Sequence, residues 1–166
     1  MQGTLYTIGY EKFRVQDFVA ALHLARVEVL IDVRDLPLSR KRGFSKTALA
    51  AVLEENGITY VHLKGLGDPK LGRQAARAGQ HDQFRRIFGN HMATEVAQRA
   101  LDRAVELIQA RPCCLMCFEQ EHCNCHRSIV ANHIVERTGL RLHHLSLNDL
   151  ILVHEQPPHP ATLTIA

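Results

Sequence analysis

One stretch of the sequence decides the fold: Cys113-Cys114-Leu115-Met116-Cys117-Phe118-Glu119-Gln120-Glu121-His122-Cys123-Asn124-Cys125-His126-Arg127. Its first six residues form an apolar run, which predicts a buried strand. A short polar loop follows, and the amphipathic segment that begins at Cys125-His126-Arg127 predicts a helix. In α/β proteins the space between a strand end and a helix start binds ligands, because backbone donors and the helix dipole converge there.

The same alternation of strand and helix continues in both directions along the chain. Further strands are predicted over residues 5–8, 27–33, 58–63 and 140–145, with a sixth short one over 151–153. Helices are predicted over residues 15–25, over 46–55 after an N-cap at Ser45, over 81–110 in two pieces broken near Gly89-Asn90, and over 127–138 with Gly139 as the C-cap. Residues 64–79 are too many for a simple connector.

This order of elements predicts the fold class. Strands separated by helices pair in parallel through right-handed crossovers. We therefore expect an α/β, Rossmann-like, mostly parallel sheet of about five strands flanked by helices. It should form a single domain over residues 1–155, followed by a flexible Pro-rich tail over 156–166.

Composition narrows the class of partner and the compartment. The chain has 166 residues, 46% of them hydrophobic, and a formal net charge of +3 that comes mostly from arginine. This mild charge suits a small anionic ligand better than a long polyanion, so nucleic acid is a possible partner that is not strongly indicated. No apolar run is long enough to cross a membrane, and no secretion signal is visible, so we expect a cytoplasmic protein. Five cysteines, an odd count, favour free thiols over disulfides.

The end of the second predicted strand carries Asp32 and Arg34. Residues two apart in a strand point to the same side, so both side chains either face a ligand or form an ion pair with each other. Ser39 and Arg40 belong to the cationic loop that follows, which either closes over an anion or is solvated surface. Tyr10 follows the first strand and reaches the same edge of the sheet, where the carboxyl ends of parallel strands meet.

Glu119 directly follows the buried strand, where partial desolvation can make a carboxyl group a usable general acid or base. Alternatively, it only accepts hydrogen bonds from the helix that begins at Cys125 or from Arg127. His126 and Arg127 lie at a helix start, where the helix dipole disfavours cations, so they indicate a nearby anion. That anion is either a ligand or a carboxylate of the protein, and Ser128 adds a hydroxyl group in the same turn. We predict Glu119, Asp32 and His126 as catalytic residues, and the ligand-binding residues are predicted as Arg34, Ser39, Arg40, Arg127, Ser128 and Tyr10.

The cysteines leave a metal site open as an alternative. Cys117, Cys123 and Cys125 with His122 offer enough ligands for zinc or iron. The loop has no Cys-x2-Cys pair, however, so we predict no cofactor and keep the metal or redox site as an alternative.

Several short motifs occur in order along residues 4–145, and together they resemble the domain of unknown function 488 family. The motifs are Thr7-Ile8-Gly9-Tyr10, Asp32-Val33-Arg34, Pro37-x-Ser39-Arg40 with Phe44, Gly57-Ile58-x-Tyr60, Leu66-Gly67 and Cys117-x-Glu119-x5-Cys125-His126-Arg127. The resemblance implies a compact prokaryotic α/β protein and no settled activity. Asp68 stands where the family usually has a second glycine. The strand that ends at Asp32 is also similar to one of rhodanese-like sulfurtransferases, but Cys117 lacks the glycine- and arginine-bearing loop that cradles their persulfide.

These observations favour an enzyme, a hydrolase or group transferase, that acts on a small anionic, phosphate-bearing or nucleotide-like substrate. The alternatives are a non-catalytic module that binds anions or nucleic acid, and a metal or redox site on the cysteines. The Walker and Gly-x-Gly-x-x-Gly patterns are both missing, which argues against an NTPase and a dinucleotide enzyme.

Overall fold

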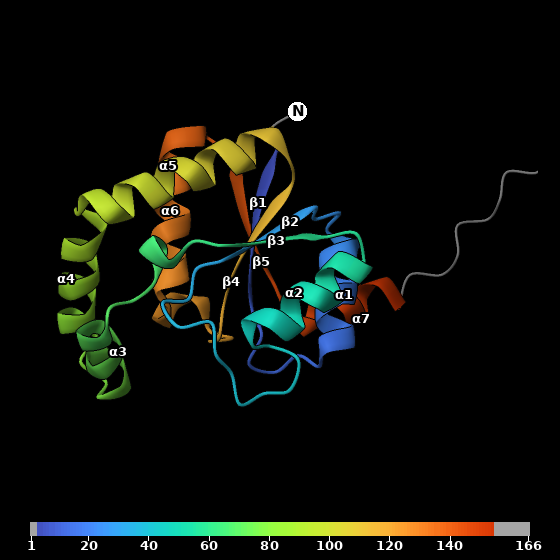
Figure 1. Ribbon diagram of the computed structural model, residues 1–166, viewed down its shortest axis with the longest axis horizontal. Helices are drawn as coiled ribbons and strands as arrows, with labels where there is room; N and C mark the ends of the chain where they lie inside the picture. The colour runs from blue at the N-terminus through green and yellow to red at the C-terminus, as the bar shows by residue number, and fades with distance from the viewer. Residues whose placement is uncertain (1–2, 155–166) are drawn as a thin grey trace, which may run out of the picture.

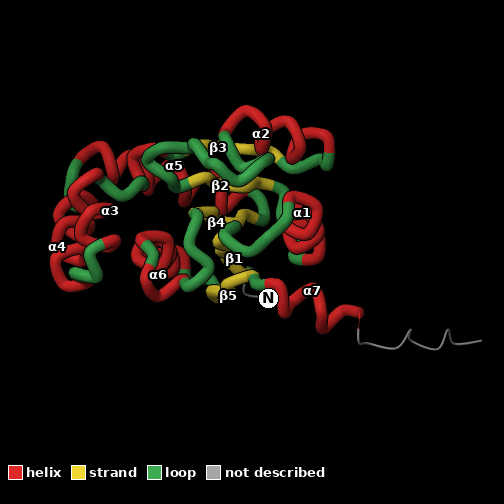
Figure 2. Tube along the Cα trace, turned by 90° about the horizontal axis from the view of Figure 1, so that it is seen from below, coloured by secondary structure: helices red, strands yellow, loops and turns green. Residues whose placement is uncertain are grey.

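A computed structural model describes residues 3–154, and its five strands form one parallel sheet. In chain order they are β1 (Thr4–Gly9), β2 (Val29–Asp32), β3 (Thr59–His62), β4 (Cys113–Cys117) and β5 (Arg141–Leu145). The strands lie side by side in the order β3-β2-β4-β1-β5, and every neighbouring pair is parallel (Figure 2). The predicted α/β class and strand number are confirmed. Because all the strands are parallel, their carboxyl ends share one edge of the sheet.

Helices cover both faces of the sheet (Figures 1 and 2). One face carries α1 (Val15–Leu24), α2 (Lys46–Glu55) and α7 (Leu147–His154), and the other carries α5 (Glu95–Ala110) and α6 (His126–Thr138). Beyond α5 and α6, α3 (Lys70–Arg77) and α4 (His81–Met92) pack against each other as a hairpin. This hairpin lies beside the carboxyl edge of the sheet, where it can contribute to a site.

The sheet separates two hydrophobic cores. Successive side chains of a strand point to opposite faces, so Ile31 and Leu115 enter the core under α5 and α6, whereas Leu30 and Met116 enter the core under α1 and α2. All residues of β2 and β4 are buried, as expected for central strands of a parallel sheet. Within residues 3–154, no helix is both long and apolar enough to cross a membrane.

The predicted sixth strand at residues 151–153 is wrong, because this segment belongs to α7. The helix begins with a side-chain cap that the apolar pattern concealed. The Asp149 carboxylate accepts hydrogen bonds from the Ser146 backbone N–H at 2.7 Å and from its hydroxyl group at 3.0 Å. Such a pair, three residues apart, fixes a helix start.

The predicted break near Gly89-Asn90 is also misplaced, because α4 continues to Met92. The chain turns at Thr94 instead, whose side chain accepts a hydrogen bond from the Ala97 N–H as the N-cap of α5. Thr94, followed by the acidic residue Glu95, indicates the start of this helix better than Gly89-Asn90 does.

The remaining predictions concern two helix caps, the stretch over residues 64–79 and the tail. Ser45 and Gly139 occupy the predicted cap positions, with Gly139 in the left-handed conformation at φ 69°. Residues 64–79 contain a 3-10 turn (Lys64–Leu66) and then α3, so this stretch is structured. The predicted tail over 156–166 lies outside the described residues.

Candidate functional site

A cavity of about 370 Å³ opens at the carboxyl edge of the sheet, and we call it the rim cavity. Its walls come from the loop after β2, from α3 and the residues before it, and from the chain between β4 and α6. It is lined by Tyr10, Arg34, Asp35, Leu36, Leu38, Ser39, Arg40, Asp68, Arg73, Arg77, Cys117, Phe118, Glu119 and His126. Six of the nine predicted catalytic and ligand-binding residues are therefore together in one place: Tyr10, Arg34, Ser39, Arg40, Glu119 and His126.

Asp32 and Arg34 form a buried ion pair at the end of β2. Arg34 Nη2 lies 2.7 Å from Asp32 Oδ2, and Arg34 Nε lies 2.9 Å from Oδ1. The Tyr60 hydroxyl group donates to Oδ2 at 2.5 Å. Arg34 Nη1 donates to the Tyr10 hydroxyl group at 3.1 Å and to the Phe44 carbonyl at 2.8 Å. The two residues thus take the mutual pairing that the sequence left open, and of the two only Arg34 lines the rim cavity.

Two arginines in the cavity wall, Arg40 and Arg77, are exposed and unpaired. Within residues 3–154, neither guanidinium group forms a hydrogen bond or ion pair with the protein. Arg73 differs, because its Nη1 lies 2.7 Å from Asp35 Oδ2 and 2.6 Å from the Asp68 carbonyl oxygen. Two unpaired guanidinium groups on one cavity favour an anionic ligand.

Asp68 brings an unusual carboxyl group to the same cavity. Its side chain is nearly buried, and its Oδ1 atom has no hydrogen-bond partner among the described residues. Burial raises the pKa of Asp68 to about 7, and the carboxylates of Glu119 and Asp35 add to this while Arg73 opposes it. A carboxyl group that is partly protonated at neutral pH can donate a proton to a bound ligand.

Arg127 does not reach the rim cavity but lies almost fully buried behind it. Its Nε donates to the Thr7 hydroxyl group at 3.0 Å, and its Nη1 donates at 2.8 Å both to Cys117 Sγ and to the Glu119 carbonyl oxygen. Burial opposes the charge, but the neighbouring Cys117 and Cys125 sulfur atoms outweigh it, so the pKa of Arg127 is raised. The groups that face this cation are thus a sulfur atom, a hydroxyl group and a backbone carbonyl of the protein itself.

The close approach of β1 to this arginine requires a glycine. A Cβ atom on Gly9 would lie 1.7 Å from the Glu119 carbonyl oxygen and 2.7 Å from Arg127 Nη1. The absent side chain lets the chain after β4 fold over the end of β1, which directs Glu119 toward the rim cavity.

Cys117, Cys125 and Glu119 form a second cluster, whose sulfur and carboxylate atoms all lie within 4.8 Å of one another. Cys117 ends β4, Cys125 is the N-cap of α6, and Glu119 Oε2 lies 3.3 Å from each sulfur. Glu119 is exposed, whereas both thiols are buried, so the carboxylate connects the sulfur pair to the open cavity.

His126 is buried in the cavity wall beside Phe88. Its Nε2 lies 2.8 Å from the Val33 carbonyl oxygen and can only donate there, so Nδ1 carries the lone pair when the ring is neutral. Burial lowers the pKa of His126, which keeps the ring uncharged. The rim cavity is thus lined here by a neutral imidazole.

Ser128 and two of the predicted metal ligands, His122 and Cys123, also lie outside the rim cavity. Ser128 donates to the His122 carbonyl oxygen and does not line the rim cavity. His122, in a short 3-10 turn (His122–Asn124), stacks on the His144 ring with centroids 3.6 Å apart, and Cys123 is exposed. Of the four metal ligands that the sequence suggested, only Cys117 and Cys125 are in the sulfur cluster.

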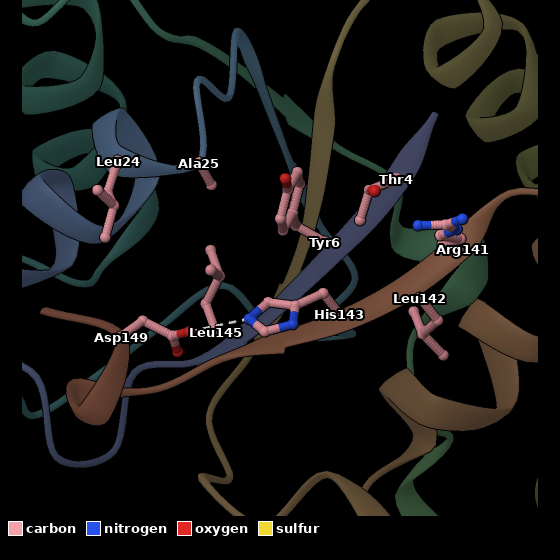
Figure 3. A pocket seen from close by; sticks show the side chains of 9 residues that line it. All are labelled: Thr4, Tyr6, Leu24, Ala25, Arg141, Leu142, His143, Leu145 and Asp149. Carbon is pink, nitrogen blue, oxygen red and sulfur yellow. Dashed lines mark hydrogen bonds and ion pairs between the residues drawn. The ribbon is translucent and has the colours of Figure 1, made fainter. Parts of the chain in front are cut away.

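A second cavity, of about 390 Å³, lies over β1 and the outer strand β5, next to the end of α1 (Figure 3). It contains a hydrogen bond between His143 Nε2 and Asp149 Oδ1, 2.9 Å apart, and is otherwise mostly apolar. None of the predicted site residues lines it, so the rim cavity remains the candidate site.

Fold and site together define a parallel α/β protein with a cationic cavity at the carboxyl edge of its sheet. The chain belongs to the family described as Domain of unknown function DUF488, whose model matches residues 14–134. No curated protein and no solved structure matches the chain.

Four charged residues of the rim cavity were not predicted from the sequence: Asp35, Asp68, Arg73 and Arg77. Arg73 and Arg77 lie on α3, whose position beside the sheet depends on tertiary packing that no local pattern encodes. Asp68 did carry a signal, since a carboxylate replaces the glycine that the family pattern leads one to expect.

Proposed function

We propose that this protein is an enzyme, a hydrolase or a group transferase, that acts on a small anionic substrate bound in the rim cavity. The observation that carries the proposal is the presence of two unpaired arginines, Arg40 and Arg77, on the cavity that also receives the Glu119 carboxylate. Cations would bind and orient the anionic part of a substrate, while the carboxylate handles protons.

The cavity wall also has an apolar part that suits the organic portion of a nucleotide-like substrate. Leu36, Leu38 and Phe118 line the cavity with exposed fractions of 53%, 73% and 44%. Exposed apolar side chains next to unpaired cations are typical of sites that bind amphiphilic metabolites.

Two carboxyl groups supply the chemistry in this proposal. Glu119 acts as the general base, because its exposed carboxylate can accept a proton from water or from a substrate hydroxyl group. Asp68 acts as the general acid, because its raised pKa keeps a share of the carboxyl group protonated at neutral pH. Environments that separate the protonation of two carboxyl groups are a common source of acid and base roles.

The test is a turnover screen with phosphate esters, nucleotides and related anionic metabolites. Once a substrate is found, Glu119→Gln should bind it with nearly unchanged affinity and turn it over about 10²–10⁴ times more slowly. Glu121→Gln is the matched control, since Glu121 is an exposed carboxylate two residues away that does not line the cavity. If the wild type and both variants bind anionic compounds but none of them turns one over, the result would favour the non-catalytic anion-binding module. Equal turnover by the wild type and Glu119→Gln would remove Glu119 from proton transfer.

A further inference from the structure

The proposed reaction makes no use of the two cysteines closest to the rim cavity, which form a pair. Cys117 Sγ and Cys125 Sγ lie 2.6 Å apart, and both residues are buried. This separation is shorter than a contact between unbonded sulfur atoms and approaches the disulfide bond length of about 2.05 Å. The end of β4 and the start of α6 thus hold the two thiols in position for a bond.

The surroundings of the pair distinguish the two sulfur atoms. The Arg127 guanidinium donates to Cys117 Sγ at 2.8 Å, and a cation in contact with sulfur stabilises the thiolate. Cys125 Sγ accepts a weaker hydrogen bond from the Arg127 backbone N–H at 3.4 Å. Burial, followed by the proximity of Cys117, raises the pKa of the Cys125 thiol. The guanidinium contact on Cys117 Sγ makes Cys117 the nucleophile of the pair and Cys125 the second thiol, which would resolve it.

Both cysteines are almost fully buried, so a small reagent would have to reach them through the rim cavity. Cys117 lines the rim cavity, and Cys125 lies behind it. Glu119 Oε2, 3.3 Å from both sulfur atoms, can accept the proton that either thiol loses. A small oxidant that enters the cavity meets Cys117 first.

The charge around the pair favours a dithiol over a metal centre. The Arg127 guanidinium lies 2.8 Å from Cys117 Sγ, where a metal ion would add a second positive charge.

We propose that Cys117 and Cys125 are a redox-active dithiol that a hydroperoxide oxidises to a reversible disulfide. The Cys117 thiolate attacks a peroxide oxygen, so an S–O bond forms, the O–O bond breaks, and the leaving oxygen takes a proton to become an alcohol or water. Cys125 sulfur then attacks Cys117 sulfur, the S–S bond forms, and the hydroxyl group leaves as water with the Cys125 proton. Two thiols lose two electrons and the hydroperoxide gains them, and a dithiol reductant reverses the step.

The test uses the exposed Cys123 as an internal comparison. The full chain, first reduced, is treated with one equivalent of hydrogen peroxide, quenched with an alkylating reagent at successive times, and mapped by mass spectrometry. We expect a Cys117–Cys125 bridge to form about tenfold faster than Cys123 is oxidised, although Cys123 is more accessible. If Cys123 is oxidised first, while Cys117 and Cys125 are still reduced and therefore alkylated by the quenching reagent, the proposal is overturned.

Variants separate the two roles. Cys125→Ser should stop at a sulfenic acid on Cys117, which dimedone labels, whereas Cys117→Ser should form neither product. Cys123→Ser should behave as the wild type. If Cys117→Ser does not fold, two readouts still test the proposal. These are the order of cysteine oxidation in the wild type and the product that Cys125→Ser forms. Stoichiometric zinc in the purified protein that blocks alkylation of both cysteines would refute the dithiol and identify a metal centre. The outcome is independent of substrate turnover, so it stands apart from the proposed function.

Discussion

Replacement of Asp68 by asparagine should stabilise the protein in a manner that depends on pH. Burial raises the pKa of Asp68 to about 7, against about 3.9 in an unfolded chain. Because the folded state binds this proton more tightly than the unfolded state, the wild type loses stability as pH rises from about 4 to about 7. Asparagine keeps the shape and does not titrate, so it avoids this loss.

The magnitude follows from the two pKa values. Their difference would correspond to roughly 4 kcal/mol above pH 7 if the whole effect appeared in folding. Although the Asp68 side chain is nearly buried, it lines the rim cavity, and water in that cavity reduces the cost of its charge. We therefore expect Asp68→Asn to gain about 1–2 kcal/mol at pH 8 and almost nothing at pH 4. This corresponds to a rise of roughly 2–8 °C in Tm at the higher pH.

The assay is urea unfolding of the wild type and Asp68→Asn at several pH values between 4 and 8. Asp82→Asn is the control, since Asp82 is exposed and its hydrogen bond with Arg85 lowers its pKa, the opposite direction. A difference between Asp68→Asn and the wild type that does not change between pH 4 and pH 8 would refute the reasoning.

Two further predictions concern the chain behind the rim cavity. Arg127→Ala should lower the free energy of unfolding by about 2–4 kcal/mol in urea titrations, because it leaves Thr7 and the Glu119 carbonyl without their donor. Arg137→Ala, on the exposed side of α6, should change it by less than about 1 kcal/mol, and equal effects of both variants would contradict the burial argument. Gly9→Ala should also destabilise the protein by more than about 2 kcal/mol, because its methyl group would overlap backbone atoms of Glu119 that cannot move aside cheaply. A wild-type Tm for Gly9→Ala would show that β1 and the chain after β4 are less closely packed than described.

Periodicity predicted the sheet well because its central strands are buried on both faces. Residues 113–118 are continuously apolar, and the strand occupies Cys113–Cys117. The same apolar signal misled at residues 151–153, since it does not distinguish a short strand from a helix whose start is fixed by Ser146 and Asp149.

The position of the candidate site was predictable, whereas the role of each polar residue was not. The rule that parallel strands end at one edge brought Tyr10, Arg40 and Glu119 to a common cavity. Whether a polar side chain faces that cavity or a protein partner depends on packing across the rim. Arg34 lies against Asp32, and Arg127 lies behind β1, although both occupy strand or helix ends that suggest ligand binding.

Titration of inorganic phosphate into the protein by calorimetry tests the central claim most directly. We predict that the wild type binds phosphate and that replacing both Arg40 and Arg77 by alanine weakens binding at least about tenfold. Arg86→Ala, on the exposed surface of α4, should leave phosphate binding unchanged. Equal phosphate binding by the wild type and the double variant, or no binding of phosphate by the wild type, would contradict an anion site in the rim cavity.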